Sequence, residues 1–232
     1  MSILSDMAEL NNKTLTEEVS EYLRRELLLT DKWEQESFLR EEDIADTLKV
    51  SRAPVREAIK ILAGLGILRF IPRRGAMVVR FSPQEIEELY DVRFALESLV
   101  FDALIKEKLW PSLDYAYLGN ILEDIVKLAR SNVDREEVFW AFSKMDISFH
   151  LYFVKKARRW VILDILNRVY TQLQHAILRD WADSKKNLFY LVEQHQKMLD
   201  MLKTGSLEDL KENRFYSYFV RRSKEPSRTF RW

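Results

Sequence analysis

Residues 50–62 read VSRAPVREAIKIL, a pattern that predicts an amphipathic helix with one apolar face and one basic face. The apolar residues recur at i, i+3, i+4 and i+7, the spacing of a single helix face. They are Val55, Ala58, Ile59 and Leu62. Arg52, Arg56 and Lys60 fall four residues apart on another face. Pro54 fits the first turn, because backbone N–H groups there have no helical partner. We therefore expect a helix from Ser51 to about Leu65 that presents long hydrogen-bond donors outward.

The segments around this helix predict a winged helix-turn-helix. Thr14 and Glu17 have the spacing of a capping box and begin an earlier helix. Residues 39–48 form a short second helix. After the third helix, residues 67–80 are rich in β-branched side chains and turn at Pro-Arg-Arg-Gly, which is typical of a β-hairpin. Three helices and a hairpin make a winged helix, which we expect to occupy residues 1–81.

The rest of the chain, residues 82–232, predicts an all-helical domain. Ser82, Pro83 and Glu85 form a strong helix start. From there, periodicity and cap spacing predict helices over about 83–108, 113–130, 134–156, 159–181, 184–203 and 206–222, and no strand pattern competes. The expected fold class is mainly α, with an N-terminal winged helix-turn-helix and a C-terminal all-helical bundle.

Composition narrows the class of protein. The 232 residues include 37 basic and 37 acidic side chains and no cysteine. The lack of cysteine excludes disulfide scaffolds, thiolate zinc sites and cysteine nucleophiles. Neither a signal peptide pattern nor an apolar run long enough to span a membrane is present, so we expect a cytoplasmic protein without a membrane partner. Residues 49–80 hold eight basic side chains and one acidic side chain, Glu57. Such a local basic block is what a surface that contacts phosphates requires.

The basic block predicts binding to double-stranded DNA. Arginine and lysine on the outer face of the third helix can reach guanine edges and phosphates in a major groove. Arg73 and Arg74 lie at the hairpin tip, which can enter an adjacent minor groove, and Gly75 lets the backbone turn close to a phosphodiester. Basic residues four apart can also form no more than a solvated face. The combination of a basic face, a short preceding helix and a basic wing favours DNA binding.

These residues carry a resemblance to a known family. VSRAPVREA at residues 50–58 resembles the signature of the GntR family of bacterial transcription regulators, and RRGAMV at residues 73–78 resembles its wing. DVRFALE at residues 91–97 is similar to the start of the ligand domain, called FCD, in the FadR-like branch. The resemblance implies a homodimer, acting as a repressor, that binds a short palindromic operator under the control of a small effector. Together with the basic pattern it gives the expected DNA contacts, which are Arg52, Ala53, Arg56, Lys60, Arg73, Arg74 and Gly75.

Three positions depart from the family pattern. Residues 30–34, TDKWE, lack the usual Pro-Gly before the second helix. Lys49 replaces a glycine that is common in the turn, and Glu42 stands where an arginine often touches DNA. A carboxylate repels phosphate, so we expect no DNA contact from Glu42 and an operator preference of the chain's own.

Two histidines interrupt apolar helix faces and predict a metal site. Asp146 and His150 are four residues apart and therefore adjacent on the helix at 134–156. His195 lies within the apolar stripe of the helix at 184–203. Buried ionisable groups are costly unless they are paired or bind a cation, and Asp with neutral His is a credible set for a divalent metal. A buried Asp–His hydrogen bond, with His195 satisfied by a backbone carbonyl, is the alternative.

The resemblance favours the metal. Metal-binding members of the branch carry an aspartate, a phenylalanine and a histidine that match Asp146, Phe149 and His150, and a second histidine that matches His195. They usually add a third histidine, but the corresponding position here lies near Ser217. The expected site has three protein ligands, with zinc or nickel as the leading metals and open positions for water or an effector.

Two more residues have competing interpretations. Arg93 and Glu97 have the i, i+4 spacing of a simple ion pair. The resemblance implies instead that Arg93 binds an effector carboxylate, for which a guanidinium is well suited. His175 shares a helix face with Asp164, Arg168, Thr171 and Arg179, so we expect it at the surface.

The expected function is a transcriptional regulator, not an enzyme, controlled by a small organic acid in a metal-containing helical domain. A regulator that binds no metal and senses an acyl-type ligand is an alternative, because the many aromatic residues of the helix at 134–156 could surround such a ligand. A metal-dependent hydrolase is another, but the chain has no nucleophile elbow, no glycine-rich phosphate loop and no HExxH motif.

Overall fold

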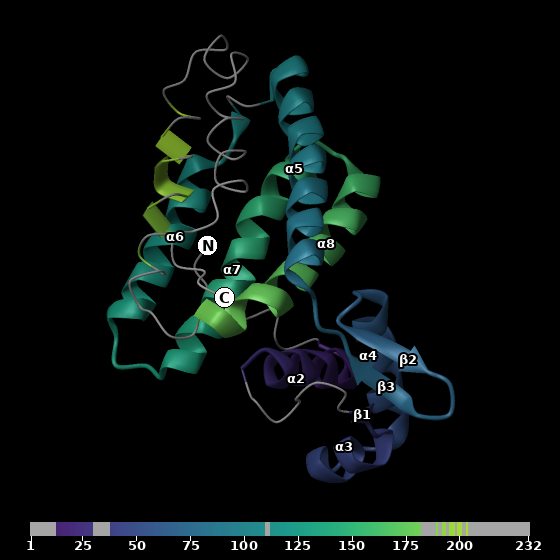
Figure 1. Ribbon diagram of the computed structural model, residues 1–232. Helices are drawn as coiled ribbons and strands as arrows, with labels where there is room; N and C mark the ends of the chain where they lie inside the picture. The colour runs from purple at the N-terminus through teal and green to yellow at the C-terminus, as the bar shows by residue number, and fades with distance from the viewer. Residues whose placement is uncertain are drawn as a thin grey trace.

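The computed structural model of the protein describes residues 13–29, 38–109 and 112–181, together with residues 189, 192–193, 195–197, 199–200 and 203. A small head of short helices and strands lies below a bundle of longer helices (Figure 1). The predicted fold class, a winged helix-turn-helix followed by an all-helical domain, is confirmed. The helix predicted over 206–222 lies outside the described residues.

The head begins with three helices. α2 (Leu15–Leu29) follows a capping box, in which the Thr14 hydroxyl accepts from the Glu17 backbone N–H at 3.3 Å and the Glu17 carboxylate accepts from the Thr14 N–H at 2.8 Å. α3 (Glu41–Leu48) and α4 (Arg52–Gly64) follow. Ser51 occupies the N-cap of α4, and its side chain makes no capping hydrogen bond. Val55, Ala58, Ile59 and Leu62 are at most 1% exposed, so the predicted apolar face of α4 is the packed one.

The wing is a three-stranded antiparallel sheet in the order β1-β3-β2. The expected hairpin consists of β2 (Leu68–Ile71) and β3 (Gly75–Val78). The sequence did not predict β1 (Phe38–Leu39), which pairs Phe38 with Met77 and Leu39 with Ala76. A two-residue strand has no alternation to detect, and its stability comes from a partner almost forty positions away in the chain.

Two turns of the head use left-handed backbone. Lys49, where the family pattern has glycine, closes α3 at φ 55° and ψ 43°. Gly75 has φ 98°, and a Cβ there would lie 3.2 Å from the Leu39 carbonyl oxygen of β1. Gly75 therefore has a structural reason to be glycine, because a side chain would combine backbone strain with crowding against the neighbouring strand.

The bundle begins at the predicted helix start. Ser82 and Glu85 form a complete capping box, and Pro83 occupies the first turn of α5 (Pro83–Lys106). α6 (Tyr115–Arg130), α7 (Arg135–Lys156) and α8 (Trp160–Trp181) follow at nearly the predicted positions. The described residues between 189 and 203 are also helical. None of the helices in the described ranges has the length and apolar character needed to cross a membrane.

Two hydrophobic cores match the head and the bundle, with one exception. Leu28 of α2 is 4% exposed and belongs to the core of the bundle. Two ion pairs also connect α2 with α7. The Lys144 Nζ lies 3.0 Å from a Glu21 carboxylate oxygen, and an Arg25 nitrogen lies 2.6 Å from Glu137. α2 therefore joins head and bundle, as its place beneath α7 and α8 in Figure 1 illustrates.

Candidate DNA-reading surface and metal centre

The recognition helix α4 presents its basic side chains to solvent. Ala53 is exposed, and the side chains of Arg52, Arg56 and Lys60 are 57%, 51% and 54% exposed. Lys60 pairs with Glu57 one turn earlier, at 2.8 Å. Arg56 contacts Glu41 of α3, with 3.0 Å between its Nε and a carboxylate oxygen. The predicted residues thus share one outer face, although they are not free of acidic partners.

The wing places its basic residues at the tip of the hairpin. Arg73 and Arg74 are exposed, and Arg73 adopts a left-handed conformation at φ 63°. The Arg74 guanidinium lies over the Phe38 ring of β1, 4.3 Å from its centroid. This cation–π contact anchors Arg74 to the sheet while its charge stays in water.

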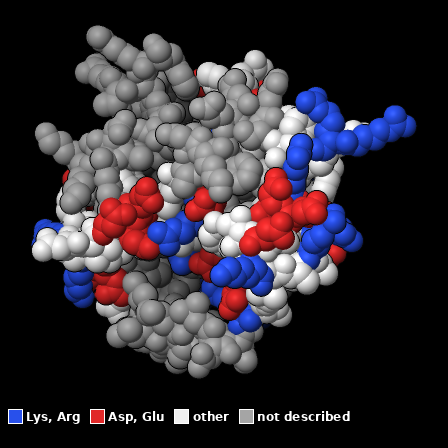
Figure 2. All heavy atoms as spheres, turned by 90° about the horizontal axis from the view of Figure 1, so that it is seen from below, with Lys and Arg blue, Asp and Glu red and all other residues white. Residues whose placement is uncertain are grey.

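Acidic and basic groups alternate on the face of the molecule that includes the head. In Figure 2 red and blue side chains interleave across this face, and blue side chains extend from one edge. The first turn of α3 supplies Glu41, Glu42 and Asp43, beside the arginines of α4. The expected block of basic residues is therefore basic along the sequence but mixed in charge on the surface.

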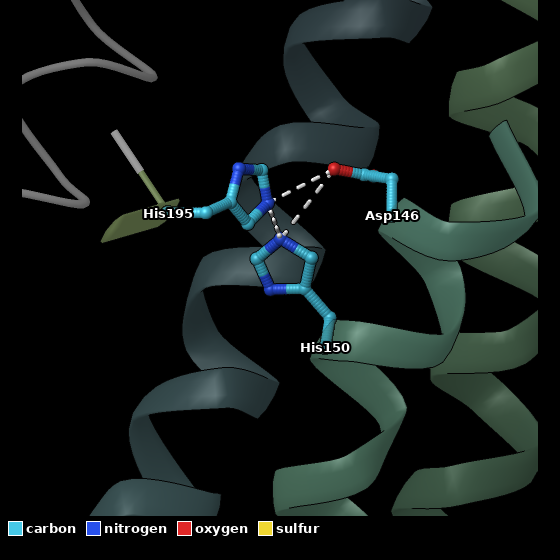
Figure 3. A group of neighbouring side chains, drawn as sticks. All are labelled: Asp146, His150 and His195. Atoms are coloured by element: carbon cyan, nitrogen blue, oxygen red, sulfur yellow. Dashed lines mark hydrogen bonds and ion pairs between the residues drawn. The ribbon is translucent and has the colours of Figure 1, made fainter. Parts of the chain in front are cut away.

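The three predicted metal ligands meet inside the bundle (Figure 3). Asp146 and His150 come from successive turns of α7, and His195 comes from the C-terminal helical segment. The two Nε2 atoms lie 3.1 Å apart, and the Asp146 Oδ1 lies 3.1 Å from Nε2 of His195 and 3.9 Å from Nε2 of His150. Both histidines are buried, at 5% and 8% exposure.

This arrangement fits a divalent ion. Atoms bound at about 2.1 Å to one tetrahedral or octahedral ion lie about 3.0–3.4 Å from one another, and two of the three separations already fall in that range. A terminal nitrogen of Arg93 lies 2.9 Å from Nε2 and 3.3 Å from Nδ1 of His150, so a positive group already borders this imidazole. The position near Ser217 that would correspond to a further ligand lies outside the described residues.

Glu97 of α5 is a site residue that the sequence did not reveal beyond its spacing from Arg93. Its carboxylate lies 3.2 Å from Nδ1 of His150, accepts from Nε of Arg93 at 3.1 Å and accepts from the Tyr170 hydroxyl of α8. A carboxylate on Nδ1 fixes the tautomer of a metal-binding histidine and leaves Nε2 for the ion. Arg93 therefore forms the ion pair with Glu97 and also borders His150, while its binding of an effector stays a prediction.

The electrostatics of the site keep the carboxylates charged and the imidazole neutral. Burial opposes ionisation of Glu97, but Arg93 and the hydrogen bond from His150 outweigh it and lower the pKa of Glu97 to about 2. Burial also opposes ionisation of Asp146, yet its contacts with the two histidines hold its pKa well below the usual range. Burial, with the charge of Arg93, lowers the pKa of His150. A neutral imidazole beside ionised carboxylates is the state in which these groups bind a metal.

The expectation that His175 lies at the surface is wrong. His175 is 4% exposed, and its Nε2 donates to the backbone carbonyl of Val79 at 2.9 Å. Its ring packs edge-on against Phe81, with 6.3 Å between centroids. The end of the head therefore covers α8 at His175, while Asp164 and Arg168 on the same face stay exposed. Periodicity along one helix cannot reveal a cover supplied by a distant segment.

Comparisons with known proteins agree along the chain. Residues 15–78 match the family described as "Bacterial regulatory proteins, gntR family", and residues 88–212 match the FCD domain. The chain is 33% identical over 175 residues to the gluconate operon transcriptional repressor of Bacillus subtilis (strain 168), which covers 74% of this chain and 69% of that protein. It is 31% identical to the protein of the same name from Bacillus licheniformis, over the same shares.

A solved structure has the same fold. E. coli McbR/YncC superposes with a TM-score of 0.67 over 92% of this chain and 98% of that one, at 20% sequence identity. At this identity the likeness concerns the arrangement of head and bundle alone.

Proposed function

This chain belongs to the GntR family of bacterial regulatory proteins, with an FCD domain, and from that premise we propose that it is a metal-containing repressor whose effector is a small organic acid. It is a transcriptional regulator and not an enzyme, as its relatives are. In this proposal residues 1–81 bind operator DNA, and residues 82–232 bind metal and effector and form the dimer. Binding to DNA places the protein in the cytoplasm.

The observation that carries the proposal is the charge of the buried cluster. Apart from the imidazoles, the cluster contains one cation, Arg93, and two anions, Glu97 and Asp146, whose charges sum to minus one. A divalent ion on Asp146, His150 and His195 reverses the sign to plus one. A single carboxylate then restores neutrality. Because unbalanced buried charge is costly, the cluster favours binding of a metal and an organic anion together.

When bound, the metal supplies a positive centre that attracts an anionic effector. Arg93 is the residue of the chain best placed to hold the same anion, since its guanidinium borders His150. Its stacking over Tyr170, with 5.0 Å to the ring centroid, and its bond to Glu97 fix the guanidinium in place. The relatives named gluconate operon repressors make sugar acids a natural class to test first.

α8 supplies a route from this site to the head. Tyr170 donates to Glu97, and its ring lies 5.5 Å from that of His150. About one turn further along α8, Gln174 accepts from Arg24 of α2, and His175 donates to Val79. A ligand that binds differently in two placements of α8 therefore shifts the head, and only that difference in affinity drives the shift.

The proposed homodimer uses exposed apolar side chains on two adjacent helices. Large apolar residues with exposures from 43% to 75% occur on α5 and α8, which pack together. They are Val92, Leu99, Trp160, Val161 and Ile165. Exposed apolar side chains on helices that pack together support the proposal of an interface here, since contiguous apolar surface usually marks one. Two heads related by symmetry suit a palindromic operator.

The proposal is tested on purified protein by metal analysis followed by operator release. We expect uptake of zinc or nickel, a rise in melting temperature, and release of selected operator DNA by a carboxylate from a panel that includes gluconate. His150→Ala should retain DNA binding in the absence of effector and lose the response to it, while Ser148→Ala, an exposed change on the same helix, should keep both. If the protein takes up neither metal, the proposal fails in favour of the metal-free regulator of an acyl ligand.

A further inference from the structure

Glu41, the first residue of α3, contacts two arginines of the recognition helix α4. Its carboxylate lies 3.0 and 3.3 Å from Nε of Arg56, and 3.9 Å from a terminal nitrogen of Arg52. Glu41 precedes these arginines by fifteen and eleven positions, so the contacts cross from one helix to the next. Within α3 the sequence pattern indicated a departure only at Glu42, the residue that follows Glu41.

The contact orders a side chain that would otherwise be free. Arg56 is 51% exposed, whereas Glu41 is only 25% exposed and is held by the fold. The arginine side chain has many rotamers, and ordering it costs affinity unless the order exists beforehand. Glu41 provides that order before DNA arrives.

The geometry leaves the reading end of Arg56 available. Glu41 accepts from Nε, on the inner edge of the guanidinium. The two terminal nitrogens form the fork that binds the O6 and N7 atoms of guanine. No other hydrogen bond to Arg56 occurs within the part of the chain that the structure describes. A carboxylate on Nε therefore directs the fork without occupying it.

A carboxylate in this place also has a cost. It repels the phosphates that supply most non-specific affinity for DNA. Repulsion by Glu41 should therefore act on every duplex, while its positioning of Arg56 offsets that repulsion on the operator alone. That opposition separates a positioning role from a general charge effect.

We infer that Glu41 is a specificity-determining residue that positions Arg56 for base recognition in the operator. The inference rests on the proposed function in one respect, the contact of Arg56 with a base edge. It adds that α3, although acidic, contributes to DNA recognition by positioning Arg56 of α4.

The experiment compares Glu41→Gln with Glu42→Gln in the full-length chain. Both changes remove one negative charge from the first turn of α3, but Glu42 is exposed and makes no ion pair with an arginine among the described residues. The probes are an operator selected from random DNA by the wild-type protein and an unrelated duplex of equal length. Glu42→Gln should strengthen binding to both duplexes by the same factor. Glu41→Gln should strengthen only the unrelated duplex and lower the operator preference by about three- to tenfold.

A second measurement keeps the test independent of folding. Random-pool selection with Glu41→Gln should relax the preference at the same base pair that Arg56→Ala relaxes, and at no other. In the Arg56→Ala background, Glu41→Gln should change the preference no further. If Glu41→Gln leaves the operator preference unchanged while Arg56→Ala lowers it, the role of Glu41 is overturned and the base contact of Arg56 stands. An unchanged preference for Arg56→Ala would overturn the base contact and the inference together.

Discussion

Lys49 ends α3 in a left-handed conformation, at φ 55° and ψ 43°, that costs a residue with a Cβ about 1–2 kcal/mol. Lys49→Gly should remove that cost, less the extra freedom that glycine gains in the unfolded chain. We expect the variant to be more stable than Lys49→Ala by about 1 kcal/mol in urea denaturation. Alanine is the matched control because it also loses the charge but keeps the strain. Equal stability of the two variants would show that the turn is unstrained.

Glu97 predicts how the metal-free protein responds to acid. Its pKa is about 2 in the folded protein, against an ordinary value of 4.5, so the unfolded chain binds more protons between these values. Its contribution to stability is therefore complete above pH 4.5 and is lost as the pH falls towards 2. Glu97→Gln should remove up to about 1.4 kcal/mol per pH unit from the slope in this window.

The measurement is the free energy of unfolding at several pH values in a chelator. Asp146 also has a lowered pKa, and Asp146→Asn in a parallel series separates its share of the slope. Glu97→Gln should be less stable than the wild type at neutral pH, because it leaves Arg93 buried without its carboxylate. If its slope in acid matches that of the wild type, the charge of Glu97 does not stabilise the fold.

At the scale of elements, α8 contacts Glu97, beside the candidate metal centre, through Tyr170, and it contacts the head through His175. His175→Ala should retain binding of metal and of operator, because the contacts of His175 with Val79 and Phe81 involve neither the candidate metal ligands nor the basic residues of α4. It should lower the effect of effector on DNA affinity by about fivefold or more, the lower range of typical coupling between sites. Asp164→Ala, an exposed change on the same helix, is the control.

DNA affinity measured with and without effector decides this prediction. An undiminished response in His175→Ala would mean that the signal bypasses the end of α8. The other contacts between head and bundle, such as Lys144 with Glu21, would then be the next elements to test.

The elements that could be predicted from sequence are those whose stability is local. The capping boxes at Thr14 and Ser82 and the face of α4 mark their helices without help from the rest of the fold. β1 could not be predicted, because its two residues are a strand only beside β3. His175 was misassigned for the same reason, since Val79 and Phe81 cover it from another segment.

The candidate site divides in the same way. The sequence predicts the group of Asp146, His150 and His195 that the structure brings together. Its signals are the i, i+4 spacing of the first two residues and the apolar stripe around His195. Glu97 had a sufficient local explanation in Arg93, and its contacts with His150 and Tyr170 need the packing of three helices. Sequence periodicity locates ligands that interrupt an apolar face, and it does not locate the residues that orient them.

At the scale of the whole molecule, the apolar residues on α5 and α8 predict the assembly. Leu99 and Val161 are 54% and 75% exposed. Leu99→Glu with Val161→Glu should convert a dimer to a monomer of 27.7 kDa and abolish tight binding to a palindromic operator, because each monomer then binds one half-site. Val133→Glu, at an apolar residue of similar exposure between α6 and α7, should leave the dimer intact. Sedimentation velocity measures the oligomeric state of the wild type and of both variants. A wild-type protein that sediments as a monomer would contradict the prediction.

Leu28 has a consequence for anyone who builds chimeric sensors from such proteins. It is encoded with the head, yet it is 4% exposed in the core of the bundle, and Arg24 on the same helix bonds to Gln174. A gene fusion cut between residues 81 and 82 would therefore carry a leucine shaped for one sensing domain onto another. To work as a switch, the graft must move the complementary surface of α7 and α8 along with the head, or redesign α2 to match its new host.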